Sequence, residues 1–313
     1  LRREFAILDS EDQYRVIKRV SKSMGLDDTK WPPRQIQWFI NKQKDECRRS
    51  KDVETSDDYF AEKMNEVYRA YEELCERESL VDFGELLLRT YLLLKSNKGV
   101  LDHYQKRFRH ILVDEFQDTN EVQYQFLRLL CESDSHIMSV GDDDQSIYGW
   151  RGAKSENINR FTKDYKNTEI IRLEQNYRST SVILGAANSV IKNNQGRMGK
   201  ELWTDQKEGE PISIYSAYNE DDEARYVVGS IQNWMEQGRD LSEVAILYRS
   251  NAQSRALEEA ILREGLAYRI YGGLRFYERA EIKNAMSYLR LVFGREDDAA
   301  FERVINIPPR GIG

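Results

Sequence analysis

The sequence predicts an α/β protein with parallel sheets and a preceding all-helical segment. From residue 109 to residue 291, short apolar runs of strand length alternate with amphipathic helical patterns, which is the order of parallel strands joined by helices. Before residue 109, apolar side chains recur only at helical spacing. The composition agrees, because 40% hydrophobic residues in a chain of 313 can fill the cores of roughly two domains.

Residues 1–108 are expected to be helical throughout. Apolar residues between Phe83 and Leu94 lie on one helical face, and Asp82 with Glu85 forms an N-terminal capping signal. The prolines of residues 31–33 predict the start of a helix that runs towards Cys47. No stretch in this third of the chain has a convincing strand pattern.

The pattern changes to α/β after residue 108. Apolar runs at residues 111–113, 137–140 and 170–173 predict strands. A helical pattern from Val122 to Leu130 follows the first run, and another from Val182 to Ile191 follows the third. The first run ends in Asp114-Glu115 and the second in Gly141-Asp142. We expect a parallel sheet covered on both faces, with both acidic clusters at the carboxyl ends of strands, where such sheets place their functional loops.

A second α/β unit is predicted after the polar connector of residues 192–210. Its expected strands are residues 212–215, 244–248 and 268–271, and its expected helices are residues 223–234 and 252–263. After residue 291 the pattern becomes helical again.

Composition excludes several classes of protein. No apolar run approaches the roughly 20 residues that a membrane-spanning helix needs, so we expect no membrane partner. The cysteines (Cys47, Cys75 and Cys131) form no C-x-x-C pair, which argues against a disulfide scaffold or a zinc site and favours a reducing, cytoplasmic location. The net charge of −7 does not exclude nucleic acid, because the distribution of charge matters more than its sum.

The apolar strand that ends in Asp114-Glu115 has the form of a Walker-B strand. Such a strand delivers one carboxylate to Mg²⁺, and the next carboxylate can orient or deprotonate a water molecule. One aspartate is sufficient, because Mg²⁺ keeps several of its own waters. Taken alone the pattern is common, and a strand end with solvated acids is then the favoured interpretation.

Three sequence blocks in a fixed order make the pattern specific. Residues 114–119 read Asp-Glu-Phe-Gln-Asp-Thr, residues 140–152 contain Gly-Asp-Asp-Asp-Gln-Ser-Ile-Tyr-Gly-Trp-Arg-Gly, and residues 172–179 read Arg-Leu-Glu-Gln-Asn-Tyr-Arg-Ser. With these blocks the sequence resembles the UvrD, PcrA and Rep group of superfamily-one DNA helicases. Residues 219–224, 247–255 and 270–283 also resemble the second motor domain of that family.

The resemblance implies an ATP site that uses Mg²⁺. Asp114 matches the residue that binds Mg²⁺, and Glu115 matches the catalytic base for the attacking water. Gln145 matches the residue that contacts the γ-phosphate. Tyr177 would stack on adenine, and Arg178 matches the arginine finger that reaches across from the second motor domain. For these last two residues, helix-start packing and a salt bridge are the alternatives.

The resemblance also implies a site for single-stranded DNA. Tyr148 and Trp150 would stack on bases with Arg151 nearby, as aromatic platforms do in other single-strand binders. The alternative is a small hydrophobic core under the loop. Arg249 and Asn251 match strand-contacting positions of the second motor domain, although turn chemistry accounts for them equally well.

The sequence departs from the family pattern at its ends. The phosphate loop G-x-x-x-x-G-K-[ST], the glutamine segment before it and the C-terminal motifs are absent from these 313 residues. We therefore expect an internal slice of a longer helicase that does not turn over ATP by itself. In this interpretation residues 1–108 are a helical insertion in the first RecA-like motor domain, and residues 109–174 are its C-terminal part. Residues 175–291 begin the second motor domain, and residues 292–313 begin its helical accessory insertion.

The function implied by the resemblance is an ATP-dependent 3′-to-5′ DNA helicase or translocase in DNA repair. Its partners would be single-stranded DNA, single-strand/duplex junctions and repair proteins. Residues 306–313 resemble the start of a duplex-contacting segment in the accessory insertion. Two alternatives stay open: the motor part of a recombination helicase–nuclease, and a non-catalytic DNA-binding remnant.

Overall fold

The structure is a computed structural model, and it describes residues 5–54, 58–131, 135–206, 209–271, 280–295 and 297–312. The chain divides into two compact units, which we describe separately. The first unit consists of Leu1–Gln175 and Ala187–Trp203, and the second consists of Asn176–Ala186 and Thr204–Gly313. The division passes through helix α8 (Ser181–Ile191).

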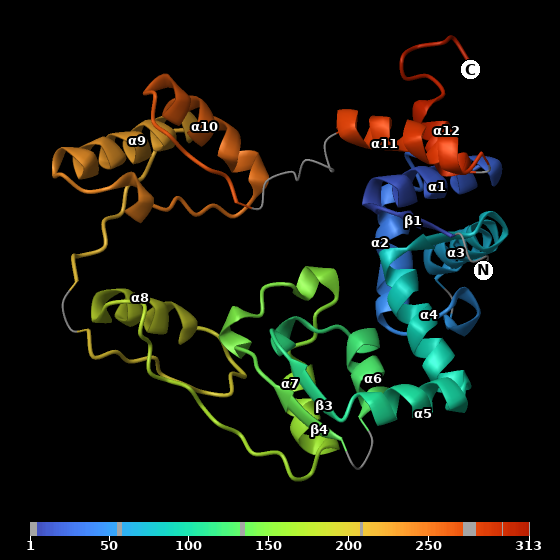
Figure 1. The fold of residues 1–313 in the computed structure, drawn as a ribbon, viewed down its shortest axis with the longest axis horizontal. Helices are drawn as coiled ribbons and strands as arrows, with labels where there is room; N and C mark the ends of the chain where they lie inside the picture. Colours follow the sequence, from blue (N-terminus) through green and yellow to red (C-terminus); the bar gives the residue numbers. More distant parts are fainter. Residues whose placement is uncertain are drawn as a thin grey trace. The chain divides into compact units, whose positions relative to one another are not determined.

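The first unit begins with a helical part (Figure 1). In chain order this part contains β1 (Ala6–Leu8), α1 (Ser10–Ser23), α2 (Pro33–Asp45), η1 (Ser50–Asp52), α3 (Tyr59–Glu78), β2 (Leu80–Asp82), α4 (Phe83–Ser96) and α5 (Lys98–Arg107). The helices predicted around the prolines and between Phe83 and Leu94 are confirmed as α2 and α4. The expectation of helix throughout was wrong at β1 and β2, which pair in parallel over three residues each. Strands this short leave no periodic pattern in a sequence.

The helical part has a continuous apolar core. Each of α1 to α4 buries one face, as amphipathic helices do. The buried side chains include Val16, Ile17, Val20, Ile36, Ile40, Val67, Tyr68 and Leu88.

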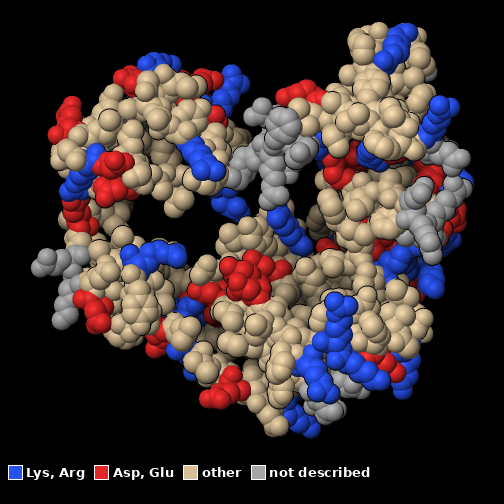
Figure 2. All heavy atoms as spheres, viewed as in Figure 1, with Lys and Arg blue, Asp and Glu red and all other residues tan. Residues whose placement is uncertain are grey.

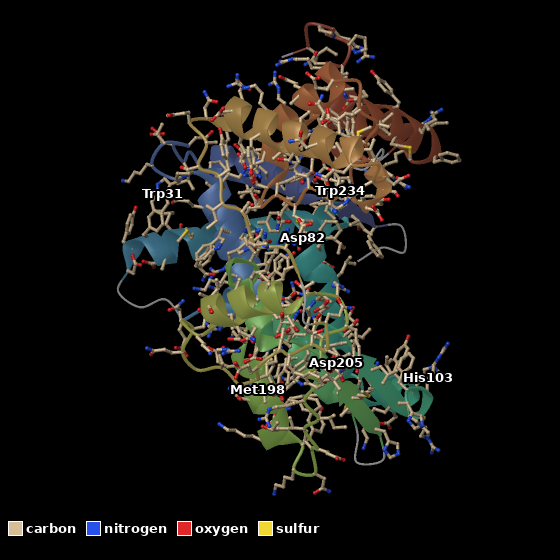
Figure 3. The ribbon with its side chains drawn as sticks, turned by 90° about the vertical axis from the view of Figure 1, so that its left-hand side faces the viewer. Trp31, Asp82, His103, Met198, Asp205 and Trp234 are labelled. Carbon is tan, nitrogen blue, oxygen red and sulfur yellow. The ribbon has the colours of Figure 1, made fainter. Side chains whose placement is uncertain are left out.

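A buried charged network crosses this core at Asp82. Its Oδ1 accepts the backbone N–H of Glu85 at 2.7 Å and so caps α4, which confirms the capping signal. Its Oδ2 accepts hydrogen bonds from Lys44 at 2.7 Å, from Tyr71 at 2.7 Å and from Gln13 at 3.1 Å. Asp82 therefore joins residues of α1, α2, α3 and α4, and Figure 3 labels its place among these helices.

Lys44 stays charged although it is 2% exposed. Burial alone would lower the pKa of Lys44, but the carboxylates of Asp82 and Glu85 outweigh burial and raise it. Glu85 also accepts two hydrogen bonds from the guanidinium of Arg49, at 2.6 and 2.7 Å. The network is thus internally neutralised, as buried charges must be.

The remaining part of the first unit carries the small parallel sheet. It contains β3 (His110–Val113), η2 (Phe116–Asp118), α6 (Glu121–Leu130), β4 (His136–Ser139), η3 (Asp143–Gln145), η4 (Gly149–Arg151) and α7 (Glu156–Asp164). β3 and β4 are parallel neighbours with Ile111 opposite Ile137, so the first two predicted strands are confirmed. The strands lie side by side in Figure 1.

Only one face of this sheet is covered by the described residues. Val113 and Ile137 pack with Tyr124 of α6 and Phe161 of α7. On the other face Leu112 is 79% exposed and Met138 is 57% exposed. The expectation of cover on both faces is therefore not met within the described part of the chain.

Four other predicted strands are not formed. Residues 170–173, 212–215, 244–248 and 268–271 have no regular structure, and the isolated bridge between Gln175 and Trp203 is the nearest ladder contact. Many of their apolar side chains are exposed, for example Ile214 at 94% and Leu247 at 93%, whereas Ile246 packs against the core of α9 (Glu220–Glu236) and α10 (Ser254–Arg263). A strand requires a hydrogen-bonded neighbour, and no described residue supplies one for these segments.

The second unit contains part of α8, then α9 (Glu220–Glu236), η5 (Leu241–Glu243), η6 (Asn251–Gln253), α10 (Ser254–Arg263), α11 (Ala280–Phe293) and α12 (Asp298–Val304). The helices predicted at residues 223–234 and 252–263 are confirmed as α9 and α10, which share a core. α11 packs on α12, where Tyr288 donates a hydrogen bond to the carbonyl of Val304 at 3.2 Å. Among the described helices, none is long and apolar enough to cross a membrane.

Asp45, the last residue of α2, contacts the sheet-bearing part of the first unit, and its ionisation affects the stability of the fold. Its carboxylate accepts a hydrogen bond from Asn120 at 2.8 Å, and burial, Asp82 and Glu46 raise its pKa to about 6. Well below pH 3.8 Asp45 is neutral in both the folded and the unfolded state. Between pH 3.8 and about 6 only the unfolded state is largely ionised, so stability falls across this window and the loss is constant at higher pH.

We expect Asp45→Asn to stabilise the protein at pH 8 by about 1–2 kcal/mol, because the variant removes the charge and keeps an oxygen for Asn120. The difference should disappear near pH 3.5, and urea unfolding at both pH values measures it. Asp28→Asn, at a carboxylate that is 45% exposed, is the control and should change stability by less than about 0.5 kcal/mol. A loss of stability at pH 8 in Asp45→Asn would contradict the prediction.

Candidate functional site

The loop after β3 presents Asp114 and Glu115 to solvent. Glu115 has a left-handed backbone, with φ of 49°, which costs a non-glycine residue about 1 kcal/mol or more. Its N–H donates to Asp114 Oδ1 at 2.9 Å, and the next N–H, of Phe116, donates to the carbonyl of Val140 at 3.0 Å. Phe116 is 3% exposed, so the residue after Glu115 is fixed in the core. Buried contacts on one side therefore hold the exposed pair in a defined conformation.

Gln117 connects the β3 loop to the β4 loop. It is 1% exposed, and its Nε2 donates to Glu115 Oε2 at 2.7 Å. Its Oε1 accepts the N–H of Asp142 at 2.9 Å. Gly141 is required for this approach, because a Cβ there would lie 2.7 Å from Gln117 Oε1 and 3.2 Å from the nitrogen of Phe116.

Asp142 organises the β4 loop. Its side chain accepts the N–H of Asp144 at 3.0 Å and the Nε2 of Gln145 at 2.8 Å. Partial burial would raise the pKa of Asp142, but hydrogen bonds from Lys200 and Gln145 lower it below its usual range.

The structure thus brings three predicted site residues to one edge of the sheet. Glu115, Gln117, Asp142 and Gln145 form a continuous chain of hydrogen bonds, and Asp114 precedes it directly. Figure 2 shows acidic side chains gathered in this part of the molecule. Asp114 offers an exposed carboxylate that fits a magnesium ion, since that ion needs only one or two protein oxygens.

The next loop carries the predicted aromatic platform. The ring centroids of Tyr148 and Trp150 are 6.3 Å apart, and the guanidinium of Arg151 lies 4.6 Å from the Trp150 ring and 5.1 Å from the Tyr148 ring. Trp150 is 60% exposed, so it is not the centre of a small core. Gly152 closes the turn with φ of 84°, a conformation that favours glycine.

Asn157 stabilises the segment that follows this loop, and the sequence analysis did not identify it as a site residue. It is 0% exposed and donates to the carbonyl of Thr119 at 3.0 Å, while the N–H of Lys154 donates to the same carbonyl at 3.0 Å. Asn157 ties the segment after the platform to the segment after the β3 acids. An asparagine in a helix gives no local signal of such a role.

The other predicted site residues belong to the second unit. Tyr177 is 78% exposed, and Arg178 follows it in a turn where Asn176 Oδ1 accepts the N–H of Arg178 at 2.9 Å. The side chains of Arg249 and Asn251 are exposed. The turn chemistry expected around them is present, because Gln253 Oε1 accepts the N–H groups of Arg249 and Ser250 at 3.0 Å. Of the other segments noted in the sequence, residues 272–279 and Gly313 lie outside the described residues.

Comparison with known proteins defines the class of this chain: it belongs to the UvrD-like helicases. The UvrD/REP helicase N-terminal domain matches residues 1–166, and the UvrD-like helicase C-terminal domain matches residues 171–313. The resemblance found in the sequence is confirmed. These domains imply a RecA-like α/β fold, and the helices and small parallel sheets of the structure agree with it.

Individual relatives match the chain over its whole length. It is 59% identical to DNA helicase II of Escherichia coli (strain K12) over 313 residues, which are 100% of this chain and 44% of that protein. It is 55% identical to DNA helicase II of Haemophilus influenzae, of which it covers 43%. The ATP-dependent DNA helicase PcrA of Bacillus subtilis is 45% identical over 315 aligned residues, 100% of this chain and 43% of that protein. The chain therefore spans less than half the length of these relatives.

Proposed function

We propose that this chain is part of an ATP-dependent DNA helicase that moves 3′ to 5′ on single-stranded DNA. The observation that carries the proposal is the hydrogen-bond chain from Glu115 through Gln117 and Asp142 to Gln145, which joins the two acidic loops at one sheet edge. Family membership and the identity with DNA helicase II support it. On the same grounds we propose a cytoplasmic location and a role in DNA repair with repair proteins as partners.

The proposed ATP chemistry uses exposed side chains of the first unit. Asp114 would hold Mg²⁺, which when bound neutralises phosphate charge. Glu115 accepts a proton from the attacking water, and its orientation is set by Gln117. Gln145 contacts the γ-phosphate with the second N–H of its amide while the first donates to Asp142. Phosphoryl transfer depends mainly on positioning and charge stabilisation, and these residues supply both.

The second unit contributes the remaining groups in this proposal. Arg178 acts as the arginine finger and Tyr177 stacks on adenine, and both side chains are exposed. Arg249 and Asn251 contact the DNA strand. We retain the division into residues 1–108, 109–174, 175–291 and 292–313 as part of the same proposal. Residues 306–313 would contact the duplex at a junction.

The direct test is unwinding by the full-length protein. We expect it to hydrolyse ATP in the presence of Mg²⁺ and single-stranded DNA, and to separate a duplex that has a 3′ single-stranded tail. A duplex with only a 5′ tail is the control for direction. DNA-independent or absent ATP hydrolysis would contradict the proposed function.

Trp150→Ala tests the aromatic platform. In the full-length protein we expect single-strand affinity to fall by about 1–3 kcal/mol, the range for base stacking on an aromatic ring. The loss should be nearly independent of salt, because stacking releases no counterions, whereas Arg151→Ala should reduce the salt dependence of binding. Fluorescence anisotropy with an oligonucleotide at several salt concentrations measures both effects.

Trp38→Ala is the matched control for that experiment. Trp38 is a tryptophan of α2 with 58% exposure, close to the 60% of Trp150, and it lies outside the proposed sites. We expect its replacement to leave single-strand affinity within about twofold of the parent. Equal losses in the two variants would show that the Trp150 loop is not a specific platform.

A further inference from the structure

The acidic triplet of the β4 loop is bound by a distant segment of the first unit. Arg197 donates from Nε and Nη2 to the two oxygens of Asp144, both at 2.7 Å. Lys200 forms an ion pair with Asp142, and the N–H of Met198 donates to Asp143 at 2.7 Å. We name these contacts the clasp: Asp142, Asp143 and Asp144 with Arg197, Met198 and Lys200. Figure 3 labels Met198 within it.

The charged side chains of the clasp are largely shielded from solvent. The side chains of Arg197 and Asp144 are 17% and 13% exposed, and those of Lys200 and Asp142 are 16% and 23% exposed. Arg197 also donates to the carbonyl of Lys200 at 3.1 Å, which fixes the two cations relative to each other. Bidentate guanidinium–carboxylate pairs of this kind fix geometry as well as charge.

The triplet is not well suited to a metal ion, although its carboxylate oxygens lie within 4.8 Å of one another. Both oxygens of Asp144 face Arg197, and Asp142 is bound by Lys200 and Gln145. Two protein cations therefore already neutralise most of this charge.

Asp142 links the clasp to Gln145. Its Oδ1 meets Lys200 and the N–H of Asp144, while its Oδ2 accepts the Nε2 of Gln145. Lys200 thus fixes the carboxylate that orients the Gln145 amide. Removing Lys200 would leave Oδ1 held only by the N–H of Asp144, and would leave uncompensated negative charge beside the amide.

We propose that Arg197 and Lys200 are positioning residues that hold Gln145 ready to contact the γ-phosphate of ATP. The inference rests on the proposed function of Gln145, and it adds two residues that the sequence motifs do not contain. Because only a triphosphate has a γ-phosphate, the clasp should affect ATP binding and leave ADP binding unchanged. The segment 197–200 is followed by the chain that enters the second unit at Thr204.

The first experiment measures nucleotide affinity in the full-length protein. The probes are the non-hydrolysable ATP analogue with a β,γ-imido linkage and ADP, each with Mg²⁺. Lys200→Met and Arg197→Met should weaken binding of the ATP analogue by about tenfold and change ADP binding by less than twofold. Asp144→Asn, which removes the same ion pair from the other side, should behave like Arg197→Met.

Two control variants use the same segment. Lys192→Met removes an exposed lysine whose ion pair with Glu201 is 3.8 Å long, and it should leave both affinities unchanged. Lys200→Arg keeps the charge and should retain most of the affinity for the ATP analogue. Equal weakening of the ATP analogue and ADP, or no weakening of either, would overturn the proposal.

A double-mutant cycle tests whether the clasp acts through Gln145. Gln145→Ala alone should also weaken the ATP analogue selectively, and adding Lys200→Met should cause little further loss. Full additivity of the two losses would overturn the proposed route.

Hydrogen exchange of the unliganded protein separates this inference from the proposed function. The N–H of Gln145 donates to the carbonyl of Asp142 at 2.9 Å. Lys200→Met should accelerate hydrogen exchange in residues 142–146, and Lys192→Met should leave exchange there unchanged. If the parent protein binds no nucleotide but Lys200→Met accelerates exchange in this loop, the proposed function is wrong, whereas the role of the clasp in holding the loop is supported. If exchange in the loop is unchanged, the clasp does not hold it.

Discussion

Glu115→Gln in the full-length protein is expected to reduce ATP turnover by about 10²–10⁴-fold, the usual contribution of a positioned general base. ATP binding should stay within about twofold, because glutamine has the shape of glutamate and keeps an oxygen that can accept the 2.7 Å hydrogen bond from Gln117. The left-handed backbone at Glu115 is held by Asp114 and Phe116, and the substitution leaves both contacts in place.

Steady-state ATP hydrolysis with saturating single-stranded DNA, together with equilibrium nucleotide binding, measures the two expected results. Glu156→Gln is the control, because Glu156 is an exposed acid in the first turn of α7. It should leave both quantities unchanged. If Glu115→Gln hydrolyses ATP at a rate close to that of the parent, Glu115 is not the catalytic base.

Arg178→Ala is expected to have an equal or larger effect. Finger arginines contribute roughly 10³–10⁵-fold in related phosphoryl-transfer systems, because their charge stabilises the transferred phosphoryl group. Arg178→Lys should recover only a small part of this rate, since an ammonium group cannot reproduce the planar guanidinium fork. Single-turnover hydrolysis measures the chemical step apart from product release.

Arg225→Ala is the matched control for the finger. Arg225 is an arginine of the second unit that is 69% exposed on α9. Its loss should leave the hydrolysis rate within about twofold of the parent. If Arg178→Ala also keeps a near-parent rate while the protein binds ATP, another residue supplies the positive charge.

The sequence predicted helices better than strands, for a physical reason. α4 was predicted because its capping signal and apolar face lie within one short stretch. The apolar runs at residues 111–113 and 137–140 do form strands, because they pair with each other. Residues 212–215 have the same apolar character, but no described neighbour pairs with them, and Ile214 is 94% exposed. Periodicity reports which face a segment can bury, whereas a strand also depends on a distant partner.

Charge patterns were equally ambiguous. Residues 30–51 contain seven basic residues against two acidic ones, a pattern that is typical of a solvated helix face. Lys44 in this stretch is nevertheless 2% exposed and paired with Asp82 and Glu85. The partner residues are far along the chain, so no local pattern distinguishes a buried lysine from an exposed one.

In the candidate site too, some residues can be predicted from the sequence and others cannot. Asp114, Glu115 and Gln145 were located through motifs, and the structure places them at one sheet edge. The sequence places Arg197 and Lys200 in a polar connector, and nothing near them in the sequence indicates their contacts with Asp144 and Asp142. Motifs identify residues that could meet a ligand, and the residues that orient them become visible only in three dimensions.

Asp82 has a consequence for how the first unit unfolds. One carboxylate serves α1 through Gln13, α2 through Lys44, α3 through Tyr71 and α4 through its cap. Detaching any one of these helices leaves a buried charge short of a partner, so partial opening is costly. The four helices should therefore open together as a single cooperative folding unit, with one common opening free energy for their most protected amides.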